Sequence, residues 1–405
     1  MQLTRGLWIA RAAPALLFVS LAAELKRQAA CTRNELTMIE PFRVEVSSET
    51  IADLRKRLEA TRWPGGVGDS GGVPLGVMRD IAHYWLETFD WPAQERDINR
   101  FSHFRATLGG LRLHYIHMRS ARPDARPLLL LHGWPGSFVE MLAIVPMLTE
   151  WFHVVIPSLP GYGFSDAPSS AGMSNERIAR LFAELMTGLG YDRFAVQGGD
   201  WGAGIATWLA VQFPSRVVAL HLNYIPGSFA PFVEGELSAE EASFVGQRAQ
   251  WSDEQGAYGH VQRTRPLTLG YALSDSPAGL AAWIVEKFRE WADPRSVVPL
   301  DVLLTNVTIY WATNSIASSM RLYLESARTP LRFERGERVR VPCGIARFPY
   351  EAPFPPRTWI ARAYDIVHWT DMPQGGHFAA LEAPERLAAD VIAFVRDLER
   401  SGVPM

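Results

Sequence analysis

The chain has 405 residues, of which 48% are hydrophobic and 20% are charged, and its formal net charge at pH 7 is −3. That length can bury one large core with an added subdomain, and the balanced charge, without blocks of like sign, argues against a nucleic-acid partner. The two cysteines, Cys31 and Cys343, can supply neither a disulfide framework nor a C-x-x-C metal site.

Residues 1–37 differ in character from the rest of the chain. A basic start and an apolar run from Ala12 to Ala23 are typical of a signal peptide, but the run is shorter than the ~20 residues of a transmembrane span. The alternative is an over-long reading frame in which Met38 is the true start. We expect a cytoplasmic protein in that case, and otherwise an exported or membrane-anchored one whose membrane contact involves only residues 1–37.

The next segment, residues 38–110, is predicted to contain two helices. Ile51, Leu54 and Leu58 recur at helical spacing between residues 47 and 63, which indicates an amphipathic helix. A glycine-rich stretch at residues 64–76 interrupts the pattern, and a second helix is predicted over residues 77–89.

Strand and helix signals alternate from residue 111 onward. The continuous apolar run Leu128–Leu131 is typical of a strand buried on both faces of a parallel sheet. The alternation therefore predicts an α/β fold with a mostly parallel, doubly wound sheet. The remaining strands are predicted at 111–117, 152–156, 194–196, 217–222, 339–346 and 366–369, with helices at 174–190, 358–363 and 384–398.

Residues 225–330 interrupt this alternation with helical segments rich in aromatic residues. We predict that they form a helical cap inserted over the site, between the two parts of the core at residues 111–224 and 331–405. Seven aromatic side chains stand out in the cap: Phe229, Phe232, Phe244, Trp251, Trp283, Trp291 and Trp311.

A G-x-D-x-G string follows the strand predicted at 194–196 and precedes a helical pattern. It is the nucleophile elbow of α/β-hydrolases, with Asp200 in place of the usual serine. Gly198 and Gly202 suit a tight strand-to-helix turn, which leaves no room for Cβ atoms beside its apex. Alone, the string would more often be a turn with an N-cap aspartate, so the assignment depends on the other motifs.

The string HGWPGS at residues 132–137 follows the apolar strand at 128–131. In an α/β-hydrolase this loop supplies one backbone N–H of the oxyanion hole, here that of Trp134, and the residue after the nucleophile, Trp201, supplies the other. A glycine-proline turn would explain the glycines but not the position ahead of the elbow. Three more residues are predicted to shape this loop: His132, Gly133 and Pro135.

His377 lies on the loop after the last predicted strand, where this fold places its general base. The acid that orients it must follow a strand and leave room for a helix and a strand before His377. Glu351, 26 residues upstream, meets this requirement. Asp365 and Asp371 are too close, because they flank or end the strand that leads to His377.

These motifs together resemble those of the α/β-hydrolase-fold epoxide hydrolases of the microsomal and juvenile-hormone type, over roughly residues 40–400. HGWPGS, GGDWG and GGHFAALE match the family pattern, and Glu351 falls where that family carries its acid. Trp63-Pro64, Phe89-Asp90-Trp91 and residues 98–104 look like the family's N-terminal segment, which wraps the core.

The resemblance implies that Asp200 opens an epoxide to give an alkyl ester. His377, oriented by Glu351, would then activate water to hydrolyse the ester to a vicinal diol. Because an ionised carboxylate needs no base to become a nucleophile, the residue types fit this chemistry. No metal or organic cofactor is implied.

The resemblance also implies two cap tyrosines that activate the epoxide oxygen. By local match these are Tyr258 and Tyr323, with Tyr224, Tyr271 and Tyr310 as nearby competitors. A phenol with a pKa of about 10 can donate a hydrogen bond at neutral pH, so a tyrosine pair suits the departing alkoxide.

The aromatic cap predicts a small apolar or aromatic epoxide as the partner of water in the reaction. A detoxifying role and a biosynthetic one fit the sequence equally, and a homodimer is compatible with it.

Two other functions share part of this pattern. A haloalkane dehalogenase shares the aspartate nucleophile but lacks the wrapping segment and the tyrosines; halide release would distinguish it. A non-catalytic binding protein usually lacks a triad member, and would keep its ligand and its phenotype after Asp200→Asn.

Overall fold

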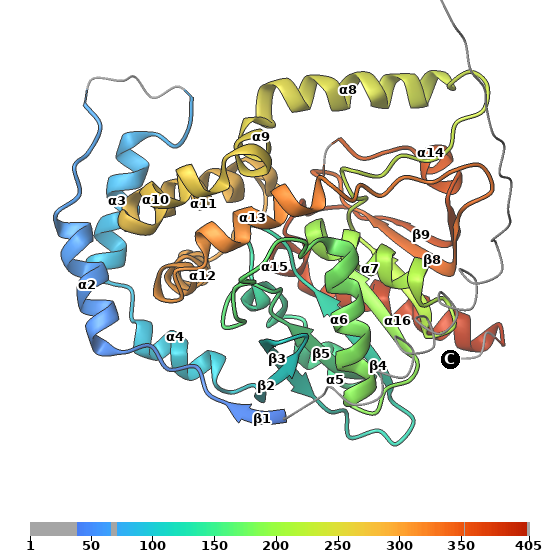
Figure 1. Ribbon diagram of the computed structural model, residues 1–405, viewed down its shortest axis with the longest axis horizontal. Coiled ribbons are helices and arrows are strands. Elements are labelled where there is room, and N and C mark those ends of the chain that lie inside the picture. The colour runs from blue at the N-terminus through green and yellow to red at the C-terminus, as the bar shows by residue number, and fades with distance from the viewer. Residues whose placement is uncertain (1–38, 66–70, 352, 403–405) are drawn as a thin grey trace, which may run out of the picture.

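The structure is a computed structural model that describes residues 39–65, 71–351 and 353–402 (Figure 1). The predicted extension, residues 1–37, and Met38 lie outside the described residues, as does part of the glycine-rich stretch. Within the described residues a nine-stranded sheet has the order β1-β2-β3-β5-β4-β6-β7-β8-β9. Its strands are β1 (Ile39–Phe42), β2 (His103–Leu108), β3 (Leu111–Met118), β4 (Arg126–Leu131), β5 (Phe152–Pro157), β6 (Phe194–Gly198), β7 (Val217–Leu222), β8 (Val339–Arg347) and β9 (Tyr364–Asp371).

The sheet is parallel from β5 to β9 and antiparallel from β1 to β5. This arrangement confirms the predicted mostly parallel sheet. β4 lies at its centre between β5 and β6, and Leu131 pairs with Gly198 at the carboxyl ends of β4 and β6. Ligands of open α/β sheets bind beyond such ends. The loop after β4 and the elbow after β6 therefore begin side by side.

Two helix pairs cover the sheet. α6 (Asn175–Gly188) packs on α7 (Asp200–Gln212), and α5 (Val145–Thr149) packs on α16 (Pro384–Arg400) (Figure 1). Ser174 is the N-cap residue of α6, although its side chain makes no cap hydrogen bond. The shorter elements of this part are η1 (Phe138–Met141), α14 (Arg357–Ala361) and α15 (Ala379–Glu382).

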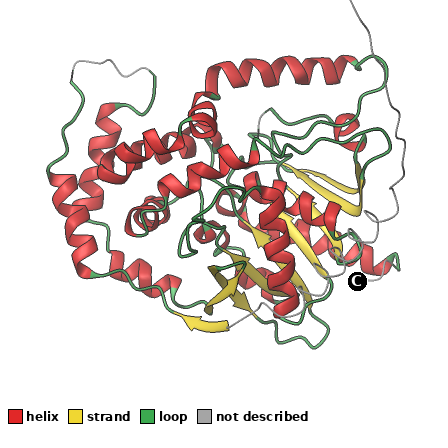
Figure 2. Ribbon diagram, in the orientation of Figure 1, coloured by secondary structure: helices red, strands yellow, loops and turns green. Residues whose placement is uncertain are grey.

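The cap between β7 and β8 consists of helices and loops over residues 239–326 (Figure 2). Its helices are α8 (Ala239–Gln255), α9 (Ala257–Thr264), α10 (Pro266–Asp275), α11 (Pro277–Trp291), α12 (Leu300–Ala312) and α13 (Ile316–Ser326). Among all described helices, none is both long enough and apolar enough to span a bilayer.

The N-terminal segment contains α2 (Ser48–Glu59), α3 (Leu75–Glu87) and α4 (Trp91–Ile98). It reaches the cap as well as the sheet: the Trp85 indole donates to Thr308 of α12 at 3.2 Å, and the Tyr84 hydroxyl donates to Asp301 at 2.9 Å. β1, β2 and α4 were not predicted. β1 is an exposed edge strand of four residues containing a proline, and such a strand shows no alternating pattern that a sequence could reveal.

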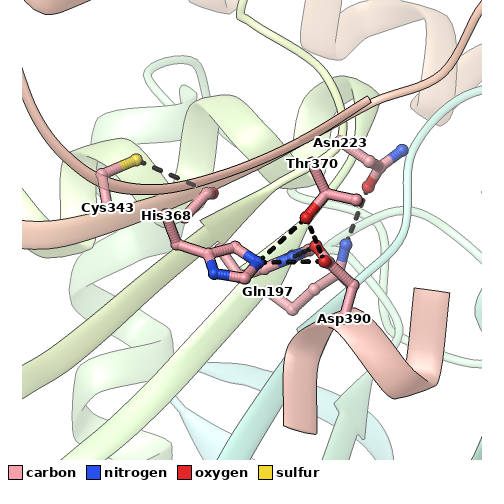
Figure 3. A network of polar contacts seen from close by, with 8 residues as sticks. Gln197, Asn223, Cys343, His368, Thr370 and Asp390 are labelled. Carbon is pink, nitrogen blue, oxygen red and sulfur yellow. Dashed lines mark hydrogen bonds and ion pairs between the residues drawn. The ribbon is translucent and has the colours of Figure 1, made fainter. Parts of the chain in front are cut away.

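A buried polar network ties α16 to the sheet (Figure 3). Asp390 of α16 lies 2.9 Å from ring nitrogens of His221 on β7 and His368 on β9, and the Thr370 hydroxyl donates to it at 2.5 Å. Burial would raise the pKa of Asp390, but these hydrogen bonds outweigh it and hold that pKa below its usual value. In turn, the hydrogen bond to Asp390 raises the pKa of His368.

We expect Asp390→Asn to lower the free energy of unfolding by about 3 kcal/mol, because it removes the charge from a buried pair. The pair with protonated His368 stabilises the fold below the unfolded-state pKa of about 6.5, and this stability is lost as the pH rises through the higher folded-state pKa. The variant should therefore lose stability less steeply than the wild type above pH 6.5. Urea unfolding at several pH values measures both effects, with Glu385→Gln on the exposed face of the same helix as the control.

Candidate active site

Asp200 is the first residue of α7 and occupies the left-handed region at φ 46°. Non-glycine residues rarely adopt this conformation, and it is concentrated at functional sites. The flanking glycines behave as predicted: a Cβ on Gly202 would overlap the carbonyl of Leu131, and a Cβ on Gly198 would overlap the carbonyl of Gly202. The apex thus holds its side chain away from the sheet, at the positive end of α7.

The side-chain amides of Gln197 and Asn223 pack against the turn that precedes Asp200 (Figure 3). Gln197 of β6 donates from Nε2 to Oδ1 of Asn223 at 2.7 Å, and both side chains are buried. The Asn223 amide lies directly against Gly199, where any Cβ would come within 2.8 Å of it. This packing keeps the peptide before Asp200 in place.

The loop after β4 holds the nucleophile candidate by its backbone. The Trp134 N–H donates to Oδ1 of Asp200 at 2.7 Å. Gly133 is required there, because a Cβ at this position would overlap the Asp200 carboxylate. Trp201 is the second residue of α7, so its N–H is one of the four that have no acceptor within the helix. These two N–H groups are the predicted oxyanion donors.

The same loop is held in shape from both sides. On the core side, the Leu159 N–H donates to Nε2 of His132 at 3.2 Å, and burial lowers the pKa of His132 to about 4, so its ring is neutral. On the cap side, Asn306 of α12 donates to the carbonyl of Pro135 at 2.7 Å, and Tyr310 donates to that of Gly136 at 2.9 Å. These contacts involve His132 and Pro135, two of the three residues predicted to shape the loop.

His377 lies between two carboxylates. Its Nδ1 is 2.8 Å from Oε2 of Glu351, and its Nε2 is 3.5 Å from Oδ2 of Asp200. Burial acts to lower the pKa of His377, but the charges of Glu351 and Asp200 outweigh it and hold that pKa well above its usual value. Its backbone N–H donates to the carbonyl of Trp291 at the end of α11, at 3.1 Å, which ties the loop to the cap.

Among the candidate tyrosines, Tyr258 and Tyr323 face the site. The Tyr258 ring stacks on Trp134, with centroids 5.4 Å apart and planes 8° apart, and the Tyr323 ring meets Trp201 edge-on at 4.5 Å. Burial and the charge of Asp200 raise the pKa of Tyr258, while a hydrogen bond from Tyr323 lowers it. Both phenols therefore remain protonated donors at neutral pH.

The competing tyrosines are placed differently. Tyr310 is buried and its hydroxyl is committed to the Gly136 carbonyl, whereas Tyr271 is 73% exposed on α10. Tyr224 lies in the site, with its ring 5.7 Å from that of His377, and its hydroxyl oxygen accepts a hydrogen bond from the backbone of Gly227. Tyr224, Tyr258 and Tyr323 line the second cavity described below, whereas Tyr271 and Tyr310 do not.

Two cavities, of about 770 and 800 Å³, meet at Asp200 and Tyr258. The first is lined by Glu351, His377 and Trp359, and the second by Trp208 and Tyr323. Their walls carry many aromatic and proline side chains, which suit an apolar ligand. In the described part of the chain, no group of three or more histidine, cysteine, aspartate or glutamate side chains could hold a metal ion.

Two residues of the site, Glu140 and Trp291, were not predicted as site residues from the sequence. Burial raises the pKa of Glu140 on η1 to about 8, so it is neutral beside the charged pair; a Cβ on Gly136 would overlap its carboxylate. Its position three residues after HGWPGS could have drawn attention to it. Trp291 was predicted only as a cap aromatic, yet its ring packs 5.0 Å from that of His377.

The sheet order, the strained acidic elbow and the loop that crosses it define an α/β-hydrolase fold. Residues 126–316 match the family description "alpha/beta hydrolase fold", and residues 39–141 match "Epoxide hydrolase N terminus". Epoxide hydrolase 1 of Oryctolagus cuniculus is 37% identical, over 89% of this chain and 90% of its own. Juvenile hormone epoxide hydrolase 1 of Ctenocephalides felis is 35% identical, over 88% of this chain and 86% of its own.

The solved structure of Aspergillus niger epoxide hydrolase superposes with a TM-score of 0.81 at 33% identity, and the match covers 89% of this chain and 97% of that one. The chain therefore belongs to the epoxide hydrolase family, and the predicted resemblance and fold class are confirmed. It is an epoxide hydrolase.

Proposed function

We propose that this epoxide hydrolase converts an apolar or aromatic epoxide to a vicinal diol through an ester on Asp200. Oδ1 of Asp200 stays on the Trp134 N–H, so Oδ2 is free to attack a ring carbon. The carbon–oxygen bond of the ring breaks as the ester bond forms. The departing oxygen takes a hydrogen bond, and then a proton, from Tyr258 or Tyr323.

Hydrolysis of the ester follows from the change of charge. While Asp200 is ionised, two carboxylates keep His377 protonated. Ester formation removes one of those charges, so the pKa of His377 falls. Its proton passes to the tyrosine that ring opening left deprotonated, and the neutral ring can then take a proton from water. That water attacks the ester carbonyl, and the oxyanion is held by the N–H groups of Trp134 and Trp201, at about 3 kcal/mol per donor in comparable sites. The diol leaves and the carboxylate is restored.

The observation that carries this proposal is the geometry at Asp200. One of its oxygens faces a backbone donor, the other faces His377, and a tyrosine pair stands across the cavity. A binding protein would have no use for a strained acidic apex held between a backbone donor and a histidine that is itself paired with a second carboxylate.

A single turnover with excess enzyme and styrene oxide tests the proposal. Quenched samples digested for mass spectrometry should show a peptide containing Asp200 that is heavier by one epoxide, and this peptide should decay as diol appears. Diol without an adduct at Asp200 would mean direct attack by water and would refute the ester. Release of halide from a haloalkane in the same assay would indicate the dehalogenase chemistry.

The tyrosine assignment predicts different outcomes for three hydroxyl deletions. Tyr258→Phe and Tyr323→Phe should each slow ester formation by roughly 10²-fold, since each removes a donor to the departing oxygen. Tyr310→Phe should leave that rate within about a factor of two or three while lowering the free energy of unfolding by about 1 kcal/mol, because its hydroxyl serves the Gly136 carbonyl. Stopped-flow single turnovers and urea unfolding measure the two quantities. A slow Tyr310 variant with normal Tyr258 and Tyr323 variants would reverse the assignment.

A further inference from the structure

Lys287 of α11 places a buried positive charge behind the proposed acid. Its side chain is 2% exposed, although a lysine is almost never buried unless it is paired. Only three of the 40 basic residues are lysines, Lys26, Lys56 and Lys287. Among the lysines and arginines that the structure describes, Lys287 is the most buried. Its partners are Glu286, in close contact, and Glu290 at 3.8 Å.

The ammonium group lies over two aromatic rings of the site. Its Nζ is 4.7 Å from the centroid of Tyr258 and 5.4 Å from that of Trp291. The Tyr258 ring also stacks on Trp134, and the charge of Asp200 raises its pKa. Tyr258 is therefore close to both a cation and the reacting carboxylate.

This position matters for the proposed reaction, because negative charge moves onto the Tyr258 oxygen as the epoxide opens. A cation at a ring face attracts a neutral phenol weakly, and a phenol that is losing its proton more strongly. Burial and the charges of Asp200 and Glu351 raise the pKa of Tyr258. A cation 4.7 Å from the centroid of its ring would favour loss of its proton. Its effect would be felt in the transition state more than in the resting enzyme.

We propose that Lys287 is a positioning residue that strengthens Tyr258 as a proton donor to the epoxide oxygen, an inference that rests on the proposed function. It touches neither substrate nor nucleophile and acts only through the ring of Tyr258. Ester formation should depend on it, and ester hydrolysis, which needs no acid at the departing oxygen, should not.

The test measures both half-reactions in Lys287→Met, which keeps the length and loses the charge. Ester formation on Asp200 from styrene oxide should slow about tenfold, and ester decay should stay within about a factor of two. Lys287→Arg should recover most of the rate, because it retains a cation able to lie on the ring. Lys56→Met, on the exposed face of α2, is the matched control and should behave as the wild type.

A double-mutant cycle separates this role from simple packing. In a Tyr258→Phe background, Lys287→Met should slow ester formation no further. An equal loss with and without the Tyr258 hydroxyl, or equal slowing of both half-reactions, would assign Lys287 to the packing of the cap and overturn the proposal.

Binding provides a readout that does not need the reaction. The carbonyl of phenylacetamide can accept from Tyr258, so Lys287→Met should weaken its binding several-fold in the parent and leave it unchanged in the Tyr258→Phe background. A wild type that forms no ester would refute the proposed function, and the amide would still report on the pair. The same affinity for the amide in wild type and Lys287→Met would refute the role of Lys287.

Discussion

His377→Gln is expected to trap the enzyme as its ester. Glutamine cannot take a proton from water, so ester hydrolysis should slow by roughly 10²–10⁴-fold, the usual contribution of a general base. Ester formation should persist, because Asp200, Tyr258 and the Trp134 N–H remain in place. A burst of epoxide consumption equal to the enzyme concentration, followed by almost no turnover, would be seen by chromatography. Mass spectrometry of the intact protein would show the adduct.

The control for this variant is Glu351→Gln, which keeps the residue that bonds Nδ1 of His377 but removes its charge. It should show the same burst with a partial loss of hydrolysis. If His377→Gln instead abolished consumption of the epoxide from the first turnover, His377 would be needed for ring opening and the division of labour proposed here would be wrong.

Asp200→Asn should abolish both ester and diol, with a fall in turnover of about 10⁶-fold, the cost of removing the nucleophile in a comparable hydrolase. Asparagine changes the site least apart from the charge, because it tolerates the left-handed backbone at φ 46° and keeps an oxygen for the Trp134 N–H. The free energy of unfolding should therefore change little.

The same variant has a second expected effect. Without the Asp200 charge, the pKa of His377 should fall toward its usual value, since one of the two carboxylates that raise it is gone. The imidazole resonances followed by NMR across pH 5–9 measure this shift. An unchanged pKa would mean that Glu351 alone sets the charge of His377, and the proposed change of its role after ester formation would fail.

The parts of the site that could be predicted from the sequence are those carried by short contiguous strings. G-x-D-x-G and HGWPGS each place a backbone group and a side chain within a few residues of one another, so the elbow at Asp200 and the loop at Trp134 follow from local sterics. Chain order then supplies His377 and Glu351, which the structure brings to 2.8 Å of each other. Their roles remain predictions until the variants are measured.

The parts that could not be predicted depend on packing between distant segments. The neutral state of Glu140 results from burial beneath the cap, and nothing in the string FVEM shows it. In the sequence, Lys287 is one charge on a predicted helix. Its contact with Tyr258, nearly thirty positions earlier in the chain, exists only in the folded protein. β2 pairs with β3 through a sequence, HFRATL, in which half-buried arginine and threonine obscure the alternation.

The two hydrogen bonds from α12 to the loop after β4 couple this part of the cap to the proposed oxyanion donor. Asn306 and Tyr310 donate hydrogen bonds to the carbonyls of Pro135 and Gly136, which follow Trp134 in the chain. A displacement of α12 would therefore pull the Trp134 N–H away from Asp200. Phe244, Val245 and Arg248 of α8 line the first cavity, and α8 lies apart from α12 in the ribbon (Figure 1), so we expect a bulky substrate to be admitted by displacement of α8. Attempts to widen the substrate range should diversify α8 and leave α12 and Tyr258 of α9 untouched, and a cap transplanted from a relative would need its own version of this loop.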